Sequence, residues 1–559
     1  GCTTVVRDQD ARGVYFGPTV TSATAIDGFT INGLNLATNA GVTVEGSTGA
    51  VISNDIVSGG SGTTSRGVDV LDAGGVAATP LITNDQINGG TGTTLSIGVR
   101  SLRSAPVIRG NCSTIDGVTG RCTSGCGGTR FIRGFSGTAG AMTVESYAVR
   151  LETSPNAEVD SSSLCMNFGG TTAVASVRIS GDATGVIVRA NNMVAFGNAS
   201  DVVGLWADPC AGASPWIVNN QQVSGGSNLV GGRANGVRAI GDCHPIVDSN
   251  FLIFGGIESA NADTAGVHCM LDGTSFIASR CVVVGNATIR GGGGGFPPTS
   301  VGVRCDDGAC ARIERNAAIT GSTGIRSIGI RLGRTGTLVA RNGIQAGCGI
   351  MEGTGVHTFD SFARIENNVI TGNVCGAGAA GGSSWGVRIQ LAPGLNEIDL
   401  HSNDIFGGGT AGAPCTSRGI SLEAGPALPT APRGILRNNI VYAGSCGTAR
   451  YDLEETSVAT DPRIFQNNDL WYGAVVATAL YRDEAASNLL AIGPVNALLD
   501  IVSSGNLSVD PMLNATNHIP AASMCVDTGT ATGAPVIDFE AETRPFGAAP
   551  DIGADEYHP

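Results

Sequence analysis

The chain has 559 residues, of which 85 are glycine, 14% are charged and 42% are hydrophobic, and its formal net charge is −15. Glycine at this frequency without a G-X-Y period excludes collagen, and the hydrophobic fraction excludes a disordered linker. The acidic balance argues against nucleic-acid binding, which needs a basic face, and no apolar run reaches the roughly 18 residues of a membrane-spanning helix.

A short module recurs along the chain. Each copy begins with Gly-Val or Gly-Ile, usually followed by arginine, and continues through a turn into an alternating stretch that ends in asparagine. Gly98-Val99-Arg100 leads in this way to Asn111, and Gly236-Val237-Arg238 leads to Asn250. The alternation within each stretch predicts β-strands, and the glycine and proline runs between them argue against helices. The leading glycines stand at 67, 98, 204, 236, 266, 302, 329, 355, 386 and 419.

The repeat predicts an all-β, parallel β-solenoid. One copy offers too few inward side chains to bury an apolar face, so the copies must stack, as about 13 or 14 coils. We expect the repeated asparagine to occupy a corner in αL geometry and to bond to the asparagine one coil away. The expected organisation is a solenoid over residues 1–470 and a C-terminal closing segment over residues 471–559.

The repeat resembles the right-handed parallel β-helix family, the pectate-lyase-like superfamily in its broad sense, over roughly residues 5–470. That resemblance implies the fold and leaves the function open, because lyases, hydrolases, tailspikes and adhesins share it. The Asp510-Pro511 pair, an S-x-C-x-D-x-G element, Arg544-Pro545 and the terminal DIGADE are similar to the ends of bacterial surface β-helix proteins. In those proteins this segment closes the last coil.

The polar residues of the closing segment have two interpretations. The first is a buried, salt-bridged cap, and the second is a calcium site, because converging carboxylates are ligands for hard cations. We favour the cap, since an arginine can neutralise the carboxylates without metal, and we expect no other cofactor. The residues concerned are Asp527, Asp538, Arg544, Asp551 and Glu556.

No catalytic residue is predicted. The adjacent acidic pairs Asp306-Asp307, Glu397/Asp399 and Glu454-Glu455 do not lie beside a histidine at the spacing of a β-helix hydrolase or lyase. The expected function is therefore a non-enzymatic scaffold or adhesin. The alternatives are a polysaccharide-binding protein, or a lyase or hydrolase that acts on acidic glycans.

The outward residue after Gly-Val forms a series of mostly cationic and aromatic side chains. Stacked coils would align these side chains into a stripe that could grip the carboxylates or sulfates of a glycan. The alternative, which the net charge favours, is that the stripe is neutralised by outward acids, namely Glu158, Asp160, Asp248, Glu314, Glu366 and Asp399. The stripe comprises Arg178, Trp206, Arg238, His268, Arg304 and Arg331, together with Arg100, Arg150, His357 and Arg388.

The 16 cysteines lie mostly in glycine-rich turns and lack zinc-type spacing, which indicates disulfides and a secreted or cell-surface protein. Their positions within the repeat suggest several pairings. The candidates are Cys122 with Cys126, Cys348 with Cys375, Cys415 with Cys446, and Cys305 with either Cys310 or Cys269.

The solenoid is expected to begin almost at once, near Val5-Val6, without a capping helix. An uncapped end exposes unpaired strand edges. We therefore expect either an upstream domain or end-to-end association of copies into a fibre, with an extracellular polysaccharide or a cell-surface component as a further candidate partner.

Overall fold

The computed structural model describes two compact units. The first comprises residues 1–282 and 292–295, and the second comprises residues 283–291 and 296–559. The residues described are 12–20, 24–125, 128–135, 143–166, 170–197, 199–228, 232–258, 263–294, 297–373, 382–391, 397–410, 413–425, 434–471, 473 and 477–559. Together the units hold about 14 turns of parallel β-solenoid, as the repeat predicts.

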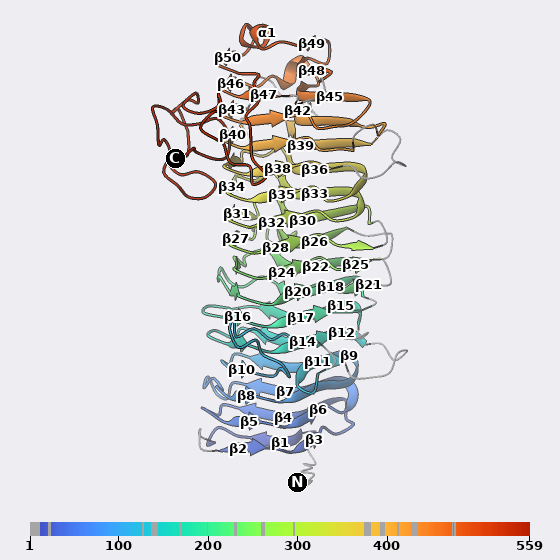
Figure 1. Ribbon diagram of the computed structural model, residues 1–559. Helices are drawn as coiled ribbons and strands as arrows, with labels where there is room; N and C mark the ends of the chain where they lie inside the picture. Colours follow the sequence, from blue (N-terminus) through green and yellow to red (C-terminus); the bar gives the residue numbers. More distant parts are fainter. Residues whose placement is uncertain are drawn as a thin grey trace. The chain divides into compact units, whose positions relative to one another are not determined.

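Each coil of the first unit contributes strands to three faces, and equivalent strands of successive coils pair in parallel (Figure 1). Face 1 carries the Gly-Val-Arg element, face 2 precedes the asparagine corner, and face 3 follows it. Face 1 comprises β1 (Arg12–Phe16), β4 (Thr38–Glu45), β7 (Ser61–Leu71), β9 (Gln86–Leu102), β12 (Thr143–Glu152), β15 (Gly170–Ser180), β18 (Asp201–Ala207), β22 (Arg233–Ile240) and β26 (Thr264–Met270). Face 2 comprises β2 (Ala25–Asp27), β5 (Val51–Ser53), β8 (Leu81–Thr83), β10 (Val107–Arg109), β13 (Glu158–Asp160), β16 (Ile187–Arg189), β19 (Trp216–Val218) and β23 (Ile246–Asp248). Face 3 comprises β3 (Thr30–Asn32), β6 (Ile56–Ser58), the start of β9, β11 (Phe131–Phe135), β14 (Ser163–Met166), β17 (Asn192–Ala195), β20 (Gln222–Ser224) and β24 (Leu252–Phe254), and a short extra sheet holds β21 (Ser227–Asn228), β25 (Ile257–Glu258) and β29 (Gly293–Gly294).

The second unit has the same three faces, and β27 (Cys281–Val284) lies at the boundary of the two units. Face 1 comprises β30 (Thr299–Asp306), β33 (Gly324–Gly333), β36 (Gly349–Phe359), β39 (Ser383–Leu391), β42 (Thr416–Ala424), β45 (Ala449–Glu455) and β48 (Ala479–Asp483). Face 2 comprises β31 (Cys310–Glu314), β34 (Leu338–Ala340), β37 (Arg364–Glu366), β40 (Asp399–His401), β43 (Ile435–Arg437), β46 (Ile464–Gln466) and β50 (Val502–Ser504). Face 3 comprises β28 (Thr288–Arg290), β32 (Ala318–Thr320), β35 (Gly343–Gln345), β38 (Val369–Thr371), β41 (Asp404–Phe406), β44 (Ile440–Tyr442) and β47 (Asp469–Leu470). The remaining elements are the 3-10 helix η1 (Val458–Thr460), β49 (Ser487–Leu489), which pairs antiparallel with β48, and α1 (Ile492–Asn496).

The core follows from the period of two within each strand. The valine of each Gly-Val element points inward, so Val99, Val237 and Val303 are fully buried. The inward residue of most face 2 strands, such as Ile52, Ile108 and Ile313, is fully buried as well. Burial of one aliphatic column per face is the main stabilisation available to a chain with so few aromatic residues.

A ladder of side-chain amides runs along the corner between faces 2 and 3. The Oδ1 atom of Asn342 accepts the backbone N–H of Asn316 at 3.0 Å and its side-chain N–H at 2.9 Å, and the Nδ2 of Asn342 donates to the carbonyl of Ile313 at 3.0 Å. The predicted interior ladder is confirmed. Its members in the first unit are Asp55, Asp85, Asn111, Ser162, Asn191, Asn220 and Asn250, and in the second unit Asn286, Asn316, Asn342, Asn368, Asn403, Asn439, Asn468 and Asn506.

The expectation that the ladder asparagine itself takes αL geometry is wrong. The positive φ belongs to the residue before it, for example Ala190 at 56°, Arg315 at 53° and Asn438 at 55°. The two tasks are incompatible at one residue, because the chain turns at the αL position while the ladder side chain must point inward along the stack. The turning residue varies in type along the chain, from Gly110 and Ala190 to Arg315 and Asn438.

Solenoid pairing continues beyond residue 470, since β48 pairs with β45 and β50 pairs with β46. Residues 507–559, which we call the strap, then run back along the side of the second unit, where the dark red trace ends at the C-terminus (Figure 1). The resemblance implied a lid over the last coil. The strap instead bonds to corners of several coils, as Asn367 donates to the carbonyl of Ile537 at 2.6 Å and Asn467 to that of Thr528 at 2.9 Å.

The helices of the described residues lack the length and apolar character needed to cross a membrane.

Candidate functional site

The outward residues after Gly-Val align in register on face 1, and we call them the outer column. In the first unit Arg178 pairs with Trp206, Trp206 with Arg238, and Arg238 with His268. In the second unit the register joins Arg304, Arg331, His357 and Arg388. The stripe expected from the sequence is therefore present within each unit.

In the outer column of the first unit, the ring of Trp206 lies between two guanidinium groups. The guanidinium carbons of Arg178 and Arg238, from the coils before and after Trp206, each lie 5.0 Å from the centre of its ring. Arg150 and Arg178 also lie 5.5 Å and 5.4 Å from the ring of Tyr147, a fully buried residue outside the column. These cation–π contacts occupy the ring surface on which a sugar would stack.

The same guanidinium groups are held by carboxylates of face 1 and its following turn. Arg238, whose side chain is 8% exposed, forms an ion pair of 2.6 Å with Asp201, and Arg178 donates to Asp208 at 2.8 Å. In the second unit Arg304 pairs with Asp306 at 2.7 Å. Neutralisation of the column is thus local to each coil and its neighbours.

The acids expected to neutralise the column lie elsewhere. Glu158, Asp160, Asp248, Glu314, Glu366 and Asp399 belong to face 2. There Glu158 pairs with Arg109 at 2.9 Å and with Arg189 at 2.7 Å, and Asp399 pairs with Arg364 at 3.4 Å. Alternation along a strand shows that a side chain points outward, but it does not show which face the strand belongs to.

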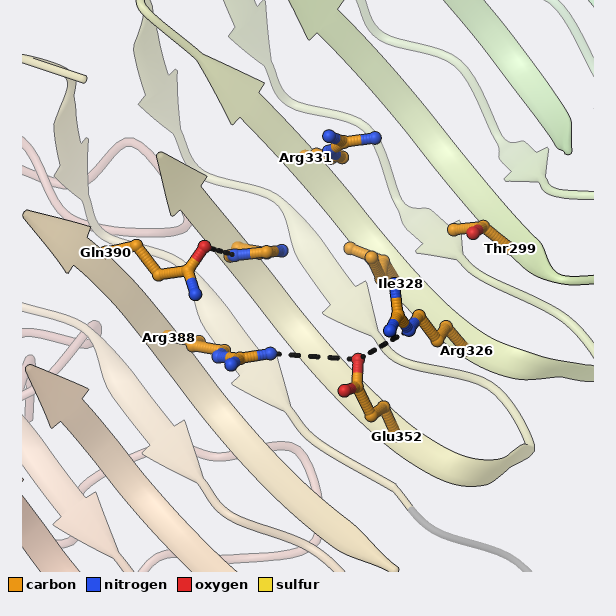
Figure 2. Close-up of a pocket in the computed structure, with 8 residues that line it drawn as sticks. Thr299, Arg326, Ile328, Arg331, Glu352, Arg388 and Gln390 are labelled. Atoms are coloured by element: carbon orange, nitrogen blue, oxygen red, sulfur yellow. Dashed lines mark hydrogen bonds and ion pairs between the residues drawn. The ribbon is translucent and has the colours of Figure 1, made fainter. Parts of the chain in front are cut away.

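A polar cavity of about 270 Å³ lies on the outer column of the second unit. Figure 2 shows Glu352 between Arg326 and Arg388, at 3.2 Å from the Nε of Arg326 and 3.7 Å from Arg388. Arg388 also pairs with Glu423 at 2.8 Å. The lining residues are Thr299, Arg326, Ile328, Arg331, Glu352, His357, Arg388 and Gln390, so three guanidinium groups face one carboxylate.

His357, which also lines this cavity, is neutral at pH 7. Burial lowers the pKa of His357 to about 3, with a further contribution from the positive charges of Arg388 and Arg331. Its Nε2 lies 3.1 Å from the Oε1 of Gln390. An imidazole with this pKa is a weak base and carries no positive charge at neutral pH.

The cavity residues that sequence reasoning missed share a fixed offset. Arg326 and Glu352 stand five residues before Arg331 and His357, in the position that Glu145 occupies before Arg150. The register places these residues beside each other in successive coils as a second outward column. In the sequence, a charged residue at a constant distance before the Gly-Val element could have identified this second column.

The acidic pairs considered for catalysis have structural partners. Asp306 is paired with Arg304 and Asp307 with Arg334. Glu397 forms a bidentate pair with Arg463, at 2.6 and 2.8 Å. Glu454 is bound by Arg418 and Arg482, and Glu455 accepts a hydrogen bond from Tyr481.

Disulfides join cysteines within coils and between them. Cys415–Cys446 and Cys305–Cys310 form as expected, the latter over the alternative with Cys269, which bonds to Cys281 instead. The Cys122–Cys126 pairing is wrong, because Cys122 is bonded to Cys112 across a loop that folds back on itself. Cys210–Cys243 joins adjacent coils. Cys126 and Cys375 lie outside the described residues, and so does the expected Cys348–Cys375 pairing.

The polar residues of the strap form one network, which is buried except for the exposed Asp527. Arg544 pairs with Glu556 at 3.3 Å and donates to the carbonyls of Asp551, Gly553, Ala554 and Asp555. Asp551 accepts the backbone N–H of Asp527 at 2.7 Å, and Asp538 accepts that of Glu556 at 3.2 Å. The five residues singled out in the sequence therefore meet, mainly through hydrogen bonds to the strap's own backbone.

No family model and no curated protein matches the chain. Among solved structures it is similar to the crystal structure of pectate lyase Pel9A, with a TM-score of 0.27 and 11% sequence identity over 98% of this chain and 96% of that chain. The assignment as a parallel β-helix rests on the strand register and the asparagine ladder.

Proposed function

We propose that the chain is a non-enzymatic, rigid β-solenoid scaffold or adhesin. The observation that carries the proposal is the outer column, in which the cationic and aromatic groups bind to one another and to neighbouring carboxylates along the stack. Such a column stabilises a repeat protein coil by coil. The neutral, weakly basic His357 and the paired state of the acidic candidates support the same interpretation.

A panel of acidic polysaccharides tests the non-enzymatic assignment. The purified protein is incubated with each polysaccharide, with and without Ca²⁺, and reducing ends and unsaturated uronates are measured. We expect no product. If the wild-type protein forms a product and Arg331→Gln or Arg388→Gln does not, the protein is an enzyme and the scaffold proposal is wrong.

We place the protein in an oxidising compartment, secreted or on a cell surface. Five disulfides among the described residues support this location, because such bonds persist mainly outside the cytosol. End-to-end association into a fibre also stays a proposal, and electron microscopy of the purified protein tests it. Isolated short rods at all concentrations would contradict the fibre.

A second candidate function is the binding of an acidic glycan at the cavity of Arg326, Arg331 and Arg388. The observation that favours it is the excess of guanidinium groups over carboxylates in the lining. A cavity of about 270 Å³ is near the lower end of the roughly 300–1,000 Å³ of small-molecule sites, which suits one uronate or sulfated sugar unit. Guanidinium groups grip carboxylates and sulfates bidentately.

Retention on immobilised polyuronate and sulfated glycan tests this candidate. We expect Arg331→Gln to reduce retention, whereas Arg334→Gln, an exposed arginine outside the cavity that pairs with Asp307, leaves it unchanged. Equal retention of the two variants would contradict glycan binding at this cavity, and the scaffold function would then be the one remaining proposal.

A further inference from the structure

Three acidic side chains from three separate turns converge at the last coil of the second unit. Asp461 directly follows η1, Glu484 lies in the turn between β48 and β49, and Asp500 lies in the turn before β50. One carboxylate oxygen of each lies within 4.8 Å of the others. The three turns are far apart in the sequence and meet only because the coil closes here.

Among the described residues, no arginine forms an ion pair with this acidic group, whereas the arginines of the outer column are paired with carboxylates. The charged neighbours that raise the pKa of Asp461 are Asp500, Glu484 and Asp483, all of which are acidic, whereas its side-chain hydrogen bond with Glu455 lowers that pKa. Burial and these neighbours raise the pKa of Asp461 to about 6. Arg482, the cation on the adjoining strand, is bound to Glu454 at 2.6 Å.

A second observation points to a ligand. Asp461 is 4% exposed, and among the described residues its Oδ1 atom has no hydrogen-bond partner. Buried carboxylate oxygens are normally satisfied by donors or by a metal ion. Asp461 combines this unsatisfied buried oxygen with a place in a group of three carboxylates.

We propose that Asp461, Glu484 and Asp500 bind a calcium ion. All the ligand atoms are oxygens, which favours a hard cation over zinc. Calcium accepts irregular arrangements of six to eight oxygens, as turns from three segments would supply, whereas magnesium requires near-octahedral geometry. Asp500 is exposed, so water can complete the coordination.

The second group with metal-binding side chains, in the strap, differs in its charge balance. There His518 and Glu540 are 3.0 Å apart and can pair with each other, and Asp555 is stabilised by the backbone N–H of Ile519 and by the charge of Arg544. Those carboxylates already have side-chain or backbone partners. Among the described residues, Asp461, Glu484 and Asp500 form no ion pair, which is why the calcium site is assigned to them.

The consequence of a bound ion is structural. A calcium ion at this position ties η1, the β48–β49 turn and the turn before β50 into one unit, which fixes the last coil where no further coil covers it within the described chain. Removal of the ion leaves mutually repelling carboxylates at the same point.

Terbium luminescence tests the proposal on the full chain. Tyr481 donates to Glu455, and both Tyr481 and Glu455 feel the charge of Asp461, so Tyr481 is close enough to sensitise a bound Tb³⁺ ion. We expect Tb³⁺ emission on tyrosine excitation, displaced by CaCl₂ at lower concentration than by MgCl₂. Glu484→Gln and Asp500→Asn are each expected to weaken Ca²⁺ binding about 10- to 100-fold.

Glu542→Gln is the matched control, because it removes one carboxylate from the strap without touching this group. It should leave the emission and the calcium competition unchanged. Calorimetric titration with CaCl₂ provides a readout independent of Tb³⁺. Equal affinities of the wild-type protein, Glu484→Gln and Asp500→Asn would overturn the site, and preferential displacement by MgCl₂ would overturn its assignment to calcium.

Discussion

The guanidinium of Arg238 lies 5.0 Å from the ring centre of Trp206 and is paired with Asp201 at 2.6 Å. Arg238 is therefore bound on one side by a ring and on another by a carboxylate from the preceding coil. A charge buried this deeply depends on both partners. This relationship shows that Trp206 and Arg238 of the outer column take part in the packing between coils.

Asp201→Asn should destabilise the first unit. The change leaves Arg238 buried without its counter-charge, and we expect a loss of about 3 kcal/mol in the free energy of unfolding. Urea unfolding followed by circular dichroism measures the change. The control is Asp72→Asn, whose partner Arg103 has a side chain 61% exposed, so that its loss should stay within about 0.5 kcal/mol. Equal effects of the two variants would contradict the structural role of the column.

Asp85→Asn should stabilise the first unit above about pH 4. Asp85 holds a ladder position, burial raises the pKa of Asp85 to about 8, and its Oδ2 has no hydrogen-bond partner among the described residues. Between the ordinary pKa and this raised value the folded state keeps the proton that the unfolded state has lost, so the free energy of unfolding falls as pH rises. Asparagine supplies a neutral amide that can donate as its ladder neighbours do, and we expect a gain of about 1–3 kcal/mol at pH 8.

Urea unfolding between pH 4 and pH 9 checks this expectation, which includes a shallower pH slope for Asp85→Asn than for the wild-type protein. Asp182→Asn is the control. Its carboxylate is exposed in a turn and has a lowered pKa because it accepts hydrogen bonds from Thr184. If the free energy of unfolding of Asp85→Asn has the same pH slope as that of the wild-type protein, Asp85 is not the group that causes the pH dependence.

Asn342→Ala should cost about 3 kcal/mol in the second unit, because it leaves the N–H of Asn316 and the carbonyls of Ile313 and Ala340 without their partner. Asn342→Ser should cost less, since Ser162 fills the equivalent position in the first unit. Thermal unfolding ranks the variants. Asn488→Ala, at an exposed position of β49, should be neutral, and an equal cost there would argue against the ladder as a stabilising element.

Loss of the Cys415–Cys446 disulfide should destabilise the second unit more than loss of Cys305–Cys310. The sequence separations are 31 and 5 residues, and loop-closure entropy gives about 4 and about 2 kcal/mol respectively. Double Cys→Ser variants compared by denaturant unfolding test the ranking. The reverse order would show that the glycine loop around Cys415 is ordered without its bond.

The fold could be predicted because one element recurs at the same place in every coil. Gly236-Val237-Arg238 and Asn250 have counterparts along the chain, and identical positions in stacked coils become columns once the coils pair. The ladder, the buried valines and the outer column all follow from that register. The ion pairs of the outer column were harder to predict. Asp201 and Glu352 both stand five residues before a member of the column, but the residue type at that offset changes from coil to coil.

The remaining features depend on segments that do not repeat. Cys112 and Cys122 meet because a loop folds back on itself, and the alternation of flanking strands carries no information about such a loop. The strap has no coil register at all, so its sequence could show that Arg544 and Glu556 would pair but not which side of the solenoid they cover. The Asp461 group was missed for the same reason, since its residues come from three unrelated turns.

The strap has a mechanical consequence. It is fastened to corners of four successive coils, through Asn367, Asp404, Asn438 and Asn467. A force applied at residue 559 would load these attachments together, in shear, before it reached the last strand. A solenoid pulled at its final strand unfolds one coil at a time, in a series of small rupture events. The second unit, pulled through the strap, would instead resist until its attachments broke together at a single high rupture force.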